Sequence, residues 1–313
     1  MKKALGGLLM VILLAGNSFV RAQDGLTPEQ ETLLDRAIAA VAARDDYESF
    51  VRADSEMQQQ NVTLSVPSLN LTQIQLNKLT REGTANVAQG DKHNIQAKVV
   101  ATVDQTIFNA DGTQDQSAST LNAEIRLVDD VLYVNATSDD AQSNIPTGWV
   151  EVDDPVSFEV FGPLGLSNYV EPGLFSDVDK LRPAVQNVRL EERTLENGQT
   201  ADYIIIDLGY EGIQTVLSRN VDPNDVFTAF LLLSVNENST FTLTIGLDEN
   251  DRLIESSSDM NLRTDQVDAH ALRPTDFPDG TFVKYEGHYL ETSSYSHINE
   301  PLEAVESPIE LTQ

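Results

Sequence analysis

Two spacings of hydrophobic residues divide the chain. Near the N-terminus, apolar side chains recur every three or four positions, at Leu33, Leu34, Ala37, Ile38, Val41 and Ala42. This period places them on one face of a helix. Thr27 supplies an N-cap, Pro28 suits the first helical position, and Gln30 completes a capping box. The sequence therefore predicts an amphipathic helix from Pro28 that packs one stripe against the protein.

From about Asn61 the apolar residues recur at every second position, which is typical of strands with one buried and one wet face. The sets with this spacing are Leu64 and Val66; Ile74 and Leu76; Ala97, Val99, Ala101 and Val103; Leu121, Ala123, Ile125 and Leu127; and Phe241, Leu243, Ile245 and Leu247. Asp111-Gly112, Asn197-Gly198 and residues 248–251 predict hairpin turns. The run 203–206 predicts a strand covered on both faces.

Residues 155–183 break this alternation with Gly and Pro but hold many large apolar side chains. We expect loops there, with a short helix near 174–182. Two further helices are predicted over 212–219 and 223–235, and the second is apolar nearly all round, so it must be buried. A last strand is expected over 282–292, followed by a polar, extended tail.

Together these elements predict an α+β protein built on one antiparallel sheet of about ten strands. Open twisted sheets of that size usually curl, so we expect a strongly curved sheet with helices filling its concave side. The expected organisation is a signal segment over 1–22, a single domain over 23–309 and a C-terminal tail over 310–313.

The first 22 residues have the three parts of an export signal. Met-Lys-Lys is the charged start, an apolar run follows, and Val20 and Ala22 fit the cleavage site. We place cleavage between Ala22 and Gln23; the alternative is a retained N-terminal anchor. The apolar run is too short for a membrane span, which takes about 20 residues. We therefore expect an extracytoplasmic protein, secreted or periplasmic.

Composition narrows the choice of partners. The chain has no cysteine, which excludes disulfides, thiol chemistry and the lipid-modified cysteine of a bacterial lipoprotein. Its 50 acidic residues outnumber 20 Lys and Arg, for a net charge of −30. This charge argues against nucleic acid as a partner and against docking on anionic lipid. We expect a soluble monomer with no stable membrane span.

No pattern of an enzyme is found, so we predict no catalytic residue, metal site or cofactor. The four histidines lack zinc-ligand spacing and are interpreted as surface or hydrogen-bonded side chains: His93, His270, His288 and His297. Residues 248–251 lack the glycine and distal glutamate of a calcium loop. Four Asn-x-Thr sequons are interpreted as strand and turn residues: Asn61, Asn70, Asn135 and Asn238.

The remaining candidate site is an apolar interior. Segments 155–183 and 223–235 hold more large apolar side chains than short connections need. Ordinary core packing accounts for them, and so does a cavity under the curved sheet that binds an apolar ligand. The predicted wall residues are Leu174, Phe175, Val178, Val226, Phe227, Phe230, Leu231, Leu243 and Ile245. A register slip of one residue would turn the last two outward.

Several local patterns follow one another in a characteristic order: Leu132-Tyr133-Val134, Gly148-Trp149-Val150-Glu151-Val152, the hairpin 247–253 and the ending Asn299-Glu300-Pro301. In this order the chain resembles the LolA-like superfamily, and within it lipoproteins of the LppX/LprG type, over most of residues 27–309. The resemblance implies a half-barrel of antiparallel strands wrapped around helices, with a cavity for acyl chains. The missing lipobox cysteine is the chief departure, and it suggests a form without a membrane tether.

The resulting hypothesis is a non-enzymatic carrier of lipid or another apolar ligand outside the cytoplasm, with envelope lipoproteins as further candidate partners. A protein-binding or sensor module of the cell envelope, with the same fold and a filled core, is the alternative. A hydrolase with a site that the sequence does not reveal ranks last.

Overall fold

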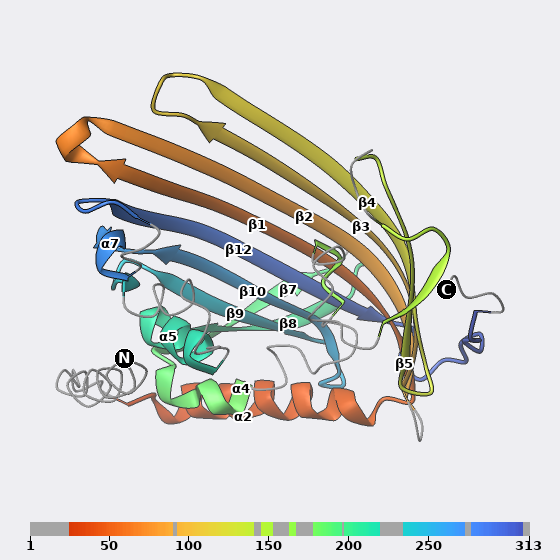
Figure 1. Ribbon diagram of the computed structural model, residues 1–313. Coiled ribbons are helices and arrows are strands. Elements are labelled where there is room, and N and C mark those ends of the chain that lie inside the picture. The colour runs from red at the N-terminus through yellow and green to blue at the C-terminus, as the bar shows by residue number, and fades with distance from the viewer. Residues whose placement is uncertain are drawn as a thin grey trace, which may run out of the picture.

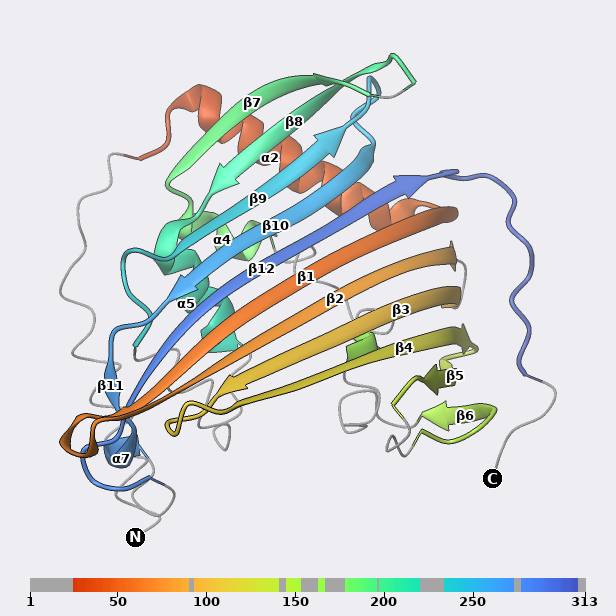
Figure 2. The same ribbon diagram turned by 90° about the horizontal axis from the view of Figure 1, so that it is seen from above.

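The computed structural model describes residues 25–89, 93–140, 145–152, 163–166, 178–195, 197–219, 234–272 and 277–308. These residues form one strongly curved antiparallel sheet with helices on its concave side (Figures 1 and 2). Within them the sheet does not close, and β6 and β7 are its two edges. The predicted α+β half-barrel is therefore confirmed.

The first half of the sheet is a meander: β1 (Ser49–Val66), β2 (Leu71–Gln89), β3 (His93–Phe108), β4 (Gln114–Val128), β5 (Val131–Ser138) and β6 (Trp149–Val152). The second half comprises β7 (Asn187–Thr194), β8 (Thr200–Asp207), β9 (Thr240–Leu247), β10 (Leu253–Arg263), β11 (Val267–Asp268) and β12 (Phe282–Ser296). The order is β6-β5-β4-β3-β2-β1-β12-β10-β9-β8-β7, with β11 paired to β12. Strands β1 and β12, far apart in sequence, join the two halves.

Helix α2 (Pro28–Ala43) runs along the concave side of the sheet (Figure 1). The predicted capping box is formed, since Thr27 Oγ1 accepts from the Gln30 amide and Gln30 Oε1 accepts from the Thr27 amide. Arg36 fastens the helix to the second half of the sheet. Its guanidinium lies 2.8 Å from Asp202 of β8 and 2.6 Å from Asp251 in the β9–β10 turn.

The other described helices are short: η2 (Arg44–Asp46), η3 (Pro67–Leu69), α4 (Val178–Leu181), η6 (Arg182–Ala184), α5 (Gly209–Arg219) and α7 (Ala269–Leu272). Helices α4 and α5 lie with α2 on the concave side (Figure 1). Within the described ranges, no helix is both long enough and apolar enough to cross a membrane.

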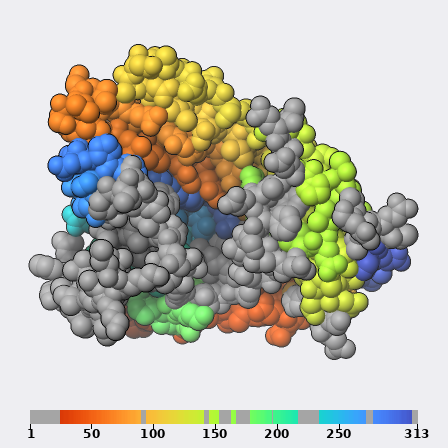
Figure 3. Space-filling view, viewed as in Figure 1, coloured from red at the N-terminus to blue at the C-terminus, as the bar shows by residue number. Residues whose placement is uncertain are grey.

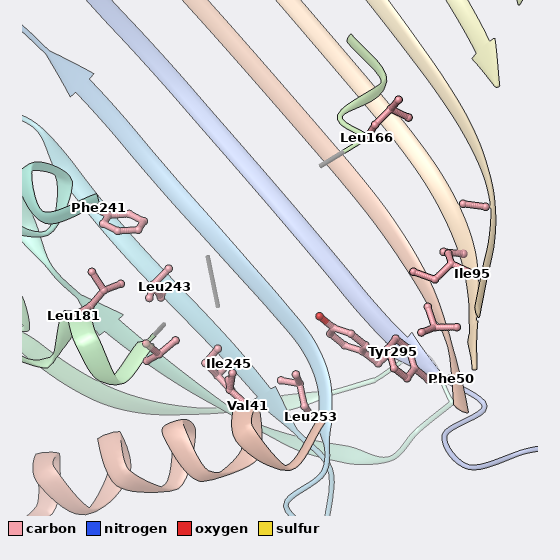
Figure 4. Close-up of a cluster of buried hydrophobic side chains, with 14 of the residues drawn as sticks. Val41, Phe50, Ile95, Leu166, Leu181, Phe241, Leu243, Ile245, Leu253 and Tyr295 are labelled. Carbon is pink, nitrogen blue, oxygen red and sulfur yellow. The ribbon is translucent and has the colours of Figure 1, made fainter. Parts of the chain in front are cut away.

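Buried side chains form one continuous cluster on the concave side (Figure 4). At one end, Phe241 and Leu243 of β9 lie near Leu181 of α4. At the other end, the rings of Phe50 and Tyr295 meet edge to face, with centroids 5.6 Å apart. Burial of each large apolar side chain contributes about 1.5–3 kcal/mol, so this cluster is the main source of stability.

Several predicted features differ in detail from the structure. Within the described residues the sheet has twelve strands rather than about ten. Strand β1 begins at Ser49, well before Asn61. The earlier start was not predicted because Arg52, Asp54 and Glu56 occupy the inward positions of its first half, where apolar residues would be expected. Strand β12 continues to Ser296, so the tail starts later than expected. Ile74 and Leu76 lie on the convex face, opposite in phase to the buried residues of β2.

The ending Asn299-Glu300-Pro301 has a structural role. Asn299 Oδ1 accepts a hydrogen bond from the Glu48 amide at 2.7 Å, and Ser49 Oγ donates to the Glu300 carbonyl at 2.6 Å. This motif fastens the tail to the start of β1. The predicted helix over 223–235, the signal segment and residues 310–313 lie outside the described residues.

Candidate functional site on the concave face

Side chains in register across the concave face change from charged to apolar within a few strands. One row contains Arg81 of β2, Glu56 of β1, Glu291 of β12, Ser258 of β10 and Leu243 of β9. Directly opposite residues in antiparallel strands point to the same side of the sheet. Charged, hydroxyl and apolar groups therefore lie side by side under one surface.

The central strands carry a band of polar residues that we call the polar strip. It comprises Arg52, Asp54, Glu56 and Gln58 of β1, Arg81 of β2, Tyr289, Glu291 and Ser293 of β12, and Ser256 and Ser258 of β10. Buried apolar side chains of β3 and β9 flank the strip on both sides: Ala97, Val99, Ala101, Phe241, Leu243 and Ile245. The concave face thus has a polar centre between two apolar zones.

Both arginines of the polar strip are paired with carboxylates. Arg52 Nε lies 2.9 Å from Asp54 Oδ2, and Arg81 Nη2 contacts Glu56 Oε2. The side chains of Arg81 and Glu56 are only 9% and 13% exposed. The Arg81 guanidinium also abuts Gly165, whose φ of +61° and crowded Cβ position suit glycine. Arg81 therefore connects the sheet to the segment 163–166 across the concave space.

Glu291 lies directly opposite Glu56 in the β1–β12 register. Among the residues that the structure describes, none donates a hydrogen bond to its carboxylate or forms an ion pair with it within 4.0 Å. Burial is the largest cause that raises the pKa of Glu291, and Asp54 adds to the rise, while the attraction of Arg81 and Arg52 opposes it. Among the described residues of the polar strip, Glu291 is therefore the carboxylate that has no ion pair, since Asp54 is paired with Arg52 and Glu56 with Arg81.

A cavity of about 190 Å³ lies beside Glu291, between the sheet and α5. Its polar wall contains Glu56, Gln58, Ser258, Tyr289 and Glu291. Its apolar wall contains Val216 of α5, Phe241 of β9 and Met260 of β10. The cavity therefore lies on the border between the polar strip and the apolar zone of β9.

Two tyrosines bound the strip at its distal end. The hydroxyls of Tyr285 and Tyr289 are in contact, and Gln60 Nε2 donates to Tyr289 at 3.3 Å. Burial is the main cause that raises the pKa of both phenols, so they stay protonated at neutral pH. A Cβ at Gly287 would lie 2.7 Å from the Tyr289 ring, so the two rings need glycine between them.

Across β1 from these tyrosines, the concave face carries a group of amide side chains. Gln75 and Gln105 both donate to Asn77 Oδ1 at 3.1 Å. In the space-filling view, β1–β4 overhang the lower part of the molecule (Figure 3). A second hollow of about 400 Å³ lies around Gly287, and most of its lining is on the convex face, including Lys78, Glu286 and His288.

The structure places three of the nine predicted wall residues. Val178 of α4 and Leu243 and Ile245 of β9 are at most 2% exposed and belong to the buried cluster. The strand-face assignment of Leu243 and Ile245 is thus correct, but they pack in the core and do not line the cavity of 190 Å³. Six predicted wall residues lie outside the described ranges: Leu174, Phe175, Val226, Phe227, Phe230 and Leu231.

Sequence reasoning missed the polar strip. Arg52, Asp54 and Glu56 occupy every second position, in phase with Val62 and Leu64 further along β1. Extending the strand backwards in this phase would have put all three on the concave face. This shared phase does not by itself predict an inward direction, because charged residues at every second position are more often on a solvent-exposed face.

The other candidate polar residues have structural partners. His270, His288 and His297 are hydrogen bonded to Phe277, Asp259 and Glu300 respectively. Residues 248–251 form the predicted turn, in which Asp248 accepts from two backbone amides. The four sequon asparagines lie in strands β1 and β5 or in turns. No group of three potential metal ligands occurs within the part of the chain that is described.

No family profile and no curated protein matches the sequence. Solved structures with a similar arrangement include lipoprotein LppX of Mycobacterium tuberculosis, at 13% identity and a TM-score of 0.35 over 87% of this chain and 98% of that one. LprF of Mycobacterium bovis has 12% identity and a TM-score of 0.35 over 89% and 97%. A DUF1329 family protein of Desulfovibrio piger has 11% identity and a TM-score of 0.21 over 83% and 92%.

Proposed function

We propose that this protein is a non-enzymatic, monomeric carrier outside the cytoplasm, which holds an apolar or amphipathic ligand between the curved sheet and its helices. The cavity against Val216, Phe241 and Met260, next to the buried cluster, is the observation that supports this best. Apolar cavities with a few convergent polar groups are the usual setting for small ligands. The predicted signal over 1–22 supports the location.

Lipid acyl chains are the proposed ligand class. The sequence resemblance to lipoproteins of the LppX/LprG type supports this class, and it makes envelope lipoproteins candidate partners. Six of the proposed wall residues lie in segments 174–175 and 226–231, whose apolar character the sequence displays. Removal of the signal between Ala22 and Gln23 is part of the proposal.

The test is native mass spectrometry and organic extraction of the purified protein, followed by titration with a fatty acid. We expect a co-purifying amphiphile and saturable binding at one site. Met260→Trp, which fills the cavity, should weaken binding, while Leu190→Trp, at a 46% exposed position, should not. Preparations that never contain lipid and never bind added amphiphile would contradict the proposal.

A protein-binding role is the second candidate, because large apolar side chains are exposed at the free ends of the first hairpins. Leu69, Leu71 and Phe108 are 63%, 41% and 40% exposed. Scattered exposed apolar residues are common, whereas a cluster marks an interaction surface. Cross-linking in cell envelopes, with Leu69→Ser plus Phe108→Ser as the comparison, should capture a partner only through the native residues if this role applies.

A further inference from the structure

Resting on the proposed carrier function, we propose that the cavity beside Glu291 binds the ligand's head group, and that this head group carries a positively charged nitrogen. The ligand class is then an alkyl amine or another cationic amphiphile. A fatty acid or a neutral alcohol would be a poorer ligand. Glu291 is the anion that pairs with the nitrogen.

The charge balance of the polar strip is the first argument. The strip contains three carboxylates, of Asp54, Glu56 and Glu291, against the two guanidiniums of Arg52 and Arg81. The two arginines are paired with Asp54 and Glu56. Among the described residues of the strip one negative charge is therefore in excess, and Glu291 is the carboxylate without an ion pair, attracted by Arg81 and Arg52 only from beyond 4.0 Å. Desolvation of a carboxylate without an ion-pair partner is unfavourable, and either a proton or a bound cation relieves it.

The chemistry of the cavity wall is the second argument. Two carboxylates, of Glu56 and Glu291, and the amide of Gln58 face the cavity. Arg81, which attracts Glu291 more strongly than Arg52 does, is already engaged by Glu56 and packed against Gly165. An anionic head group would meet like charge here. A neutral hydroxyl would find hydrogen-bond acceptors but would leave the charge of Glu291 uncompensated.

The size and shape of the cavity give the third argument. At about 190 Å³ it is smaller than typical sites for whole ligands, which measure about 300–1,000 Å³. It suits an ammonium group and the first carbons of a chain. Phe241 and Met260 form its opposite wall, and Phe241 continues into the buried cluster of β9. A head group at Glu291 therefore points its tail toward the apolar zone.

The experiment compares three test compounds of equal chain length: dodecylamine, dodecanol and dodecanoate. Each is titrated calorimetrically into the purified full chain at pH 7, below its micelle concentration. Glu291→Gln removes the charge and keeps the shape. Glu286→Gln is the matched control, because Glu286 lies on the same strand but on the convex face, paired with Lys284 at 2.8 Å.

We expect wild type and Glu286→Gln to bind dodecylamine at least about tenfold more tightly than dodecanol. In Glu291→Gln this preference should disappear, with dodecanol binding unchanged and the fold intact by circular dichroism. Equal binding of all three compounds, or a preference that survives in Glu291→Gln, would overturn the head-group assignment and leave the carrier proposal standing. Failure of all three compounds to bind would overturn both.

Discussion

Strands β1 and β9 face the same concave space with opposite chemistry. The inward side chains of β9 are apolar and fully buried, as for Leu243 and Ile245. Those of β1 are Arg52, Asp54, Glu56 and Gln58, held by ion pairs and hydrogen bonds. A core of only apolar residues would stabilise the fold without further cost. The polar strip is therefore not explained by stability alone.

The largest expected effect comes from breaking the buried ion pair of β1. Arg81→Met leaves the Glu56 carboxylate 13% exposed and without its guanidinium. Loss of one partner of a buried pair typically costs about 3–5 kcal/mol in the free energy of unfolding. Urea denaturation measures this. The double variant Arg81→Met plus Glu56→Gln should recover part of the loss, and a double variant no better than the single one would contradict a direct pairing.

The second prediction addresses β9. Leu243 is fully buried, and Leu243→Ala should lower the free energy of unfolding by about 2–5 kcal/mol because it leaves a cavity. Leu190→Ala, at the exposed position on β7, should change it by less than about 0.5 kcal/mol. A small effect at Leu243, measured by the same urea titration, would mean that the apolar zone is loosely packed and could open for ligand.

The apolar half of this comparison was predictable from the sequence, and the polar half was not. Alternation at 241–247 and the run 203–206 placed the buried residues of β8 and β9 correctly. The charged residues of the first half of β1 are in phase with Val62 and Leu64, but charged residues at alternate positions are usually solvent-exposed, so only their strand partners establish the inward direction. Arg81 of the neighbouring strand β2 and Glu291 of β12 lie opposite Glu56, and β12 is far from β1 in sequence. That pairing is a property of the fold.

The third prediction concerns Glu291 and its pH dependence. Because burial raises the pKa of Glu291, the folded state binds its proton more tightly than the unfolded chain does. Ionised Glu291 thus lowers stability at pH 7, and this cost disappears as the pH falls through the raised pKa. Glu291→Gln should be more stable than wild type at pH 7 and no more stable below the ordinary value of 4.5.

The variant Glu286→Gln should change the stability at pH 7 in the opposite direction, that is, it should lower it. Lys284 lowers the pKa of Glu286, so its ionised form favours folding at neutral pH, and the contribution is lost in acid. Thermal unfolding of both variants from pH 3 to pH 7 should therefore show changes in opposite directions. A Glu291→Gln variant that is less stable at pH 7 would mean that the carboxylate has a favourable partner in the free protein.

The smallest expected effect concerns the ion pairs between α2 and the second half of the sheet, which contains β8 and β9. Arg36 contacts Asp202 and Asp251 at a partly exposed position, and such pairs contribute about 1 kcal/mol or less. Arg36→Met should therefore lower the free energy of unfolding by no more than that, and the loss should shrink in 1 M salt, where screening is strong. Lys98→Met, at an exposed position on β3, is the control. A loss at Arg36 that persists in salt would show that the helix is held there by packing of the arginine stem rather than by charge.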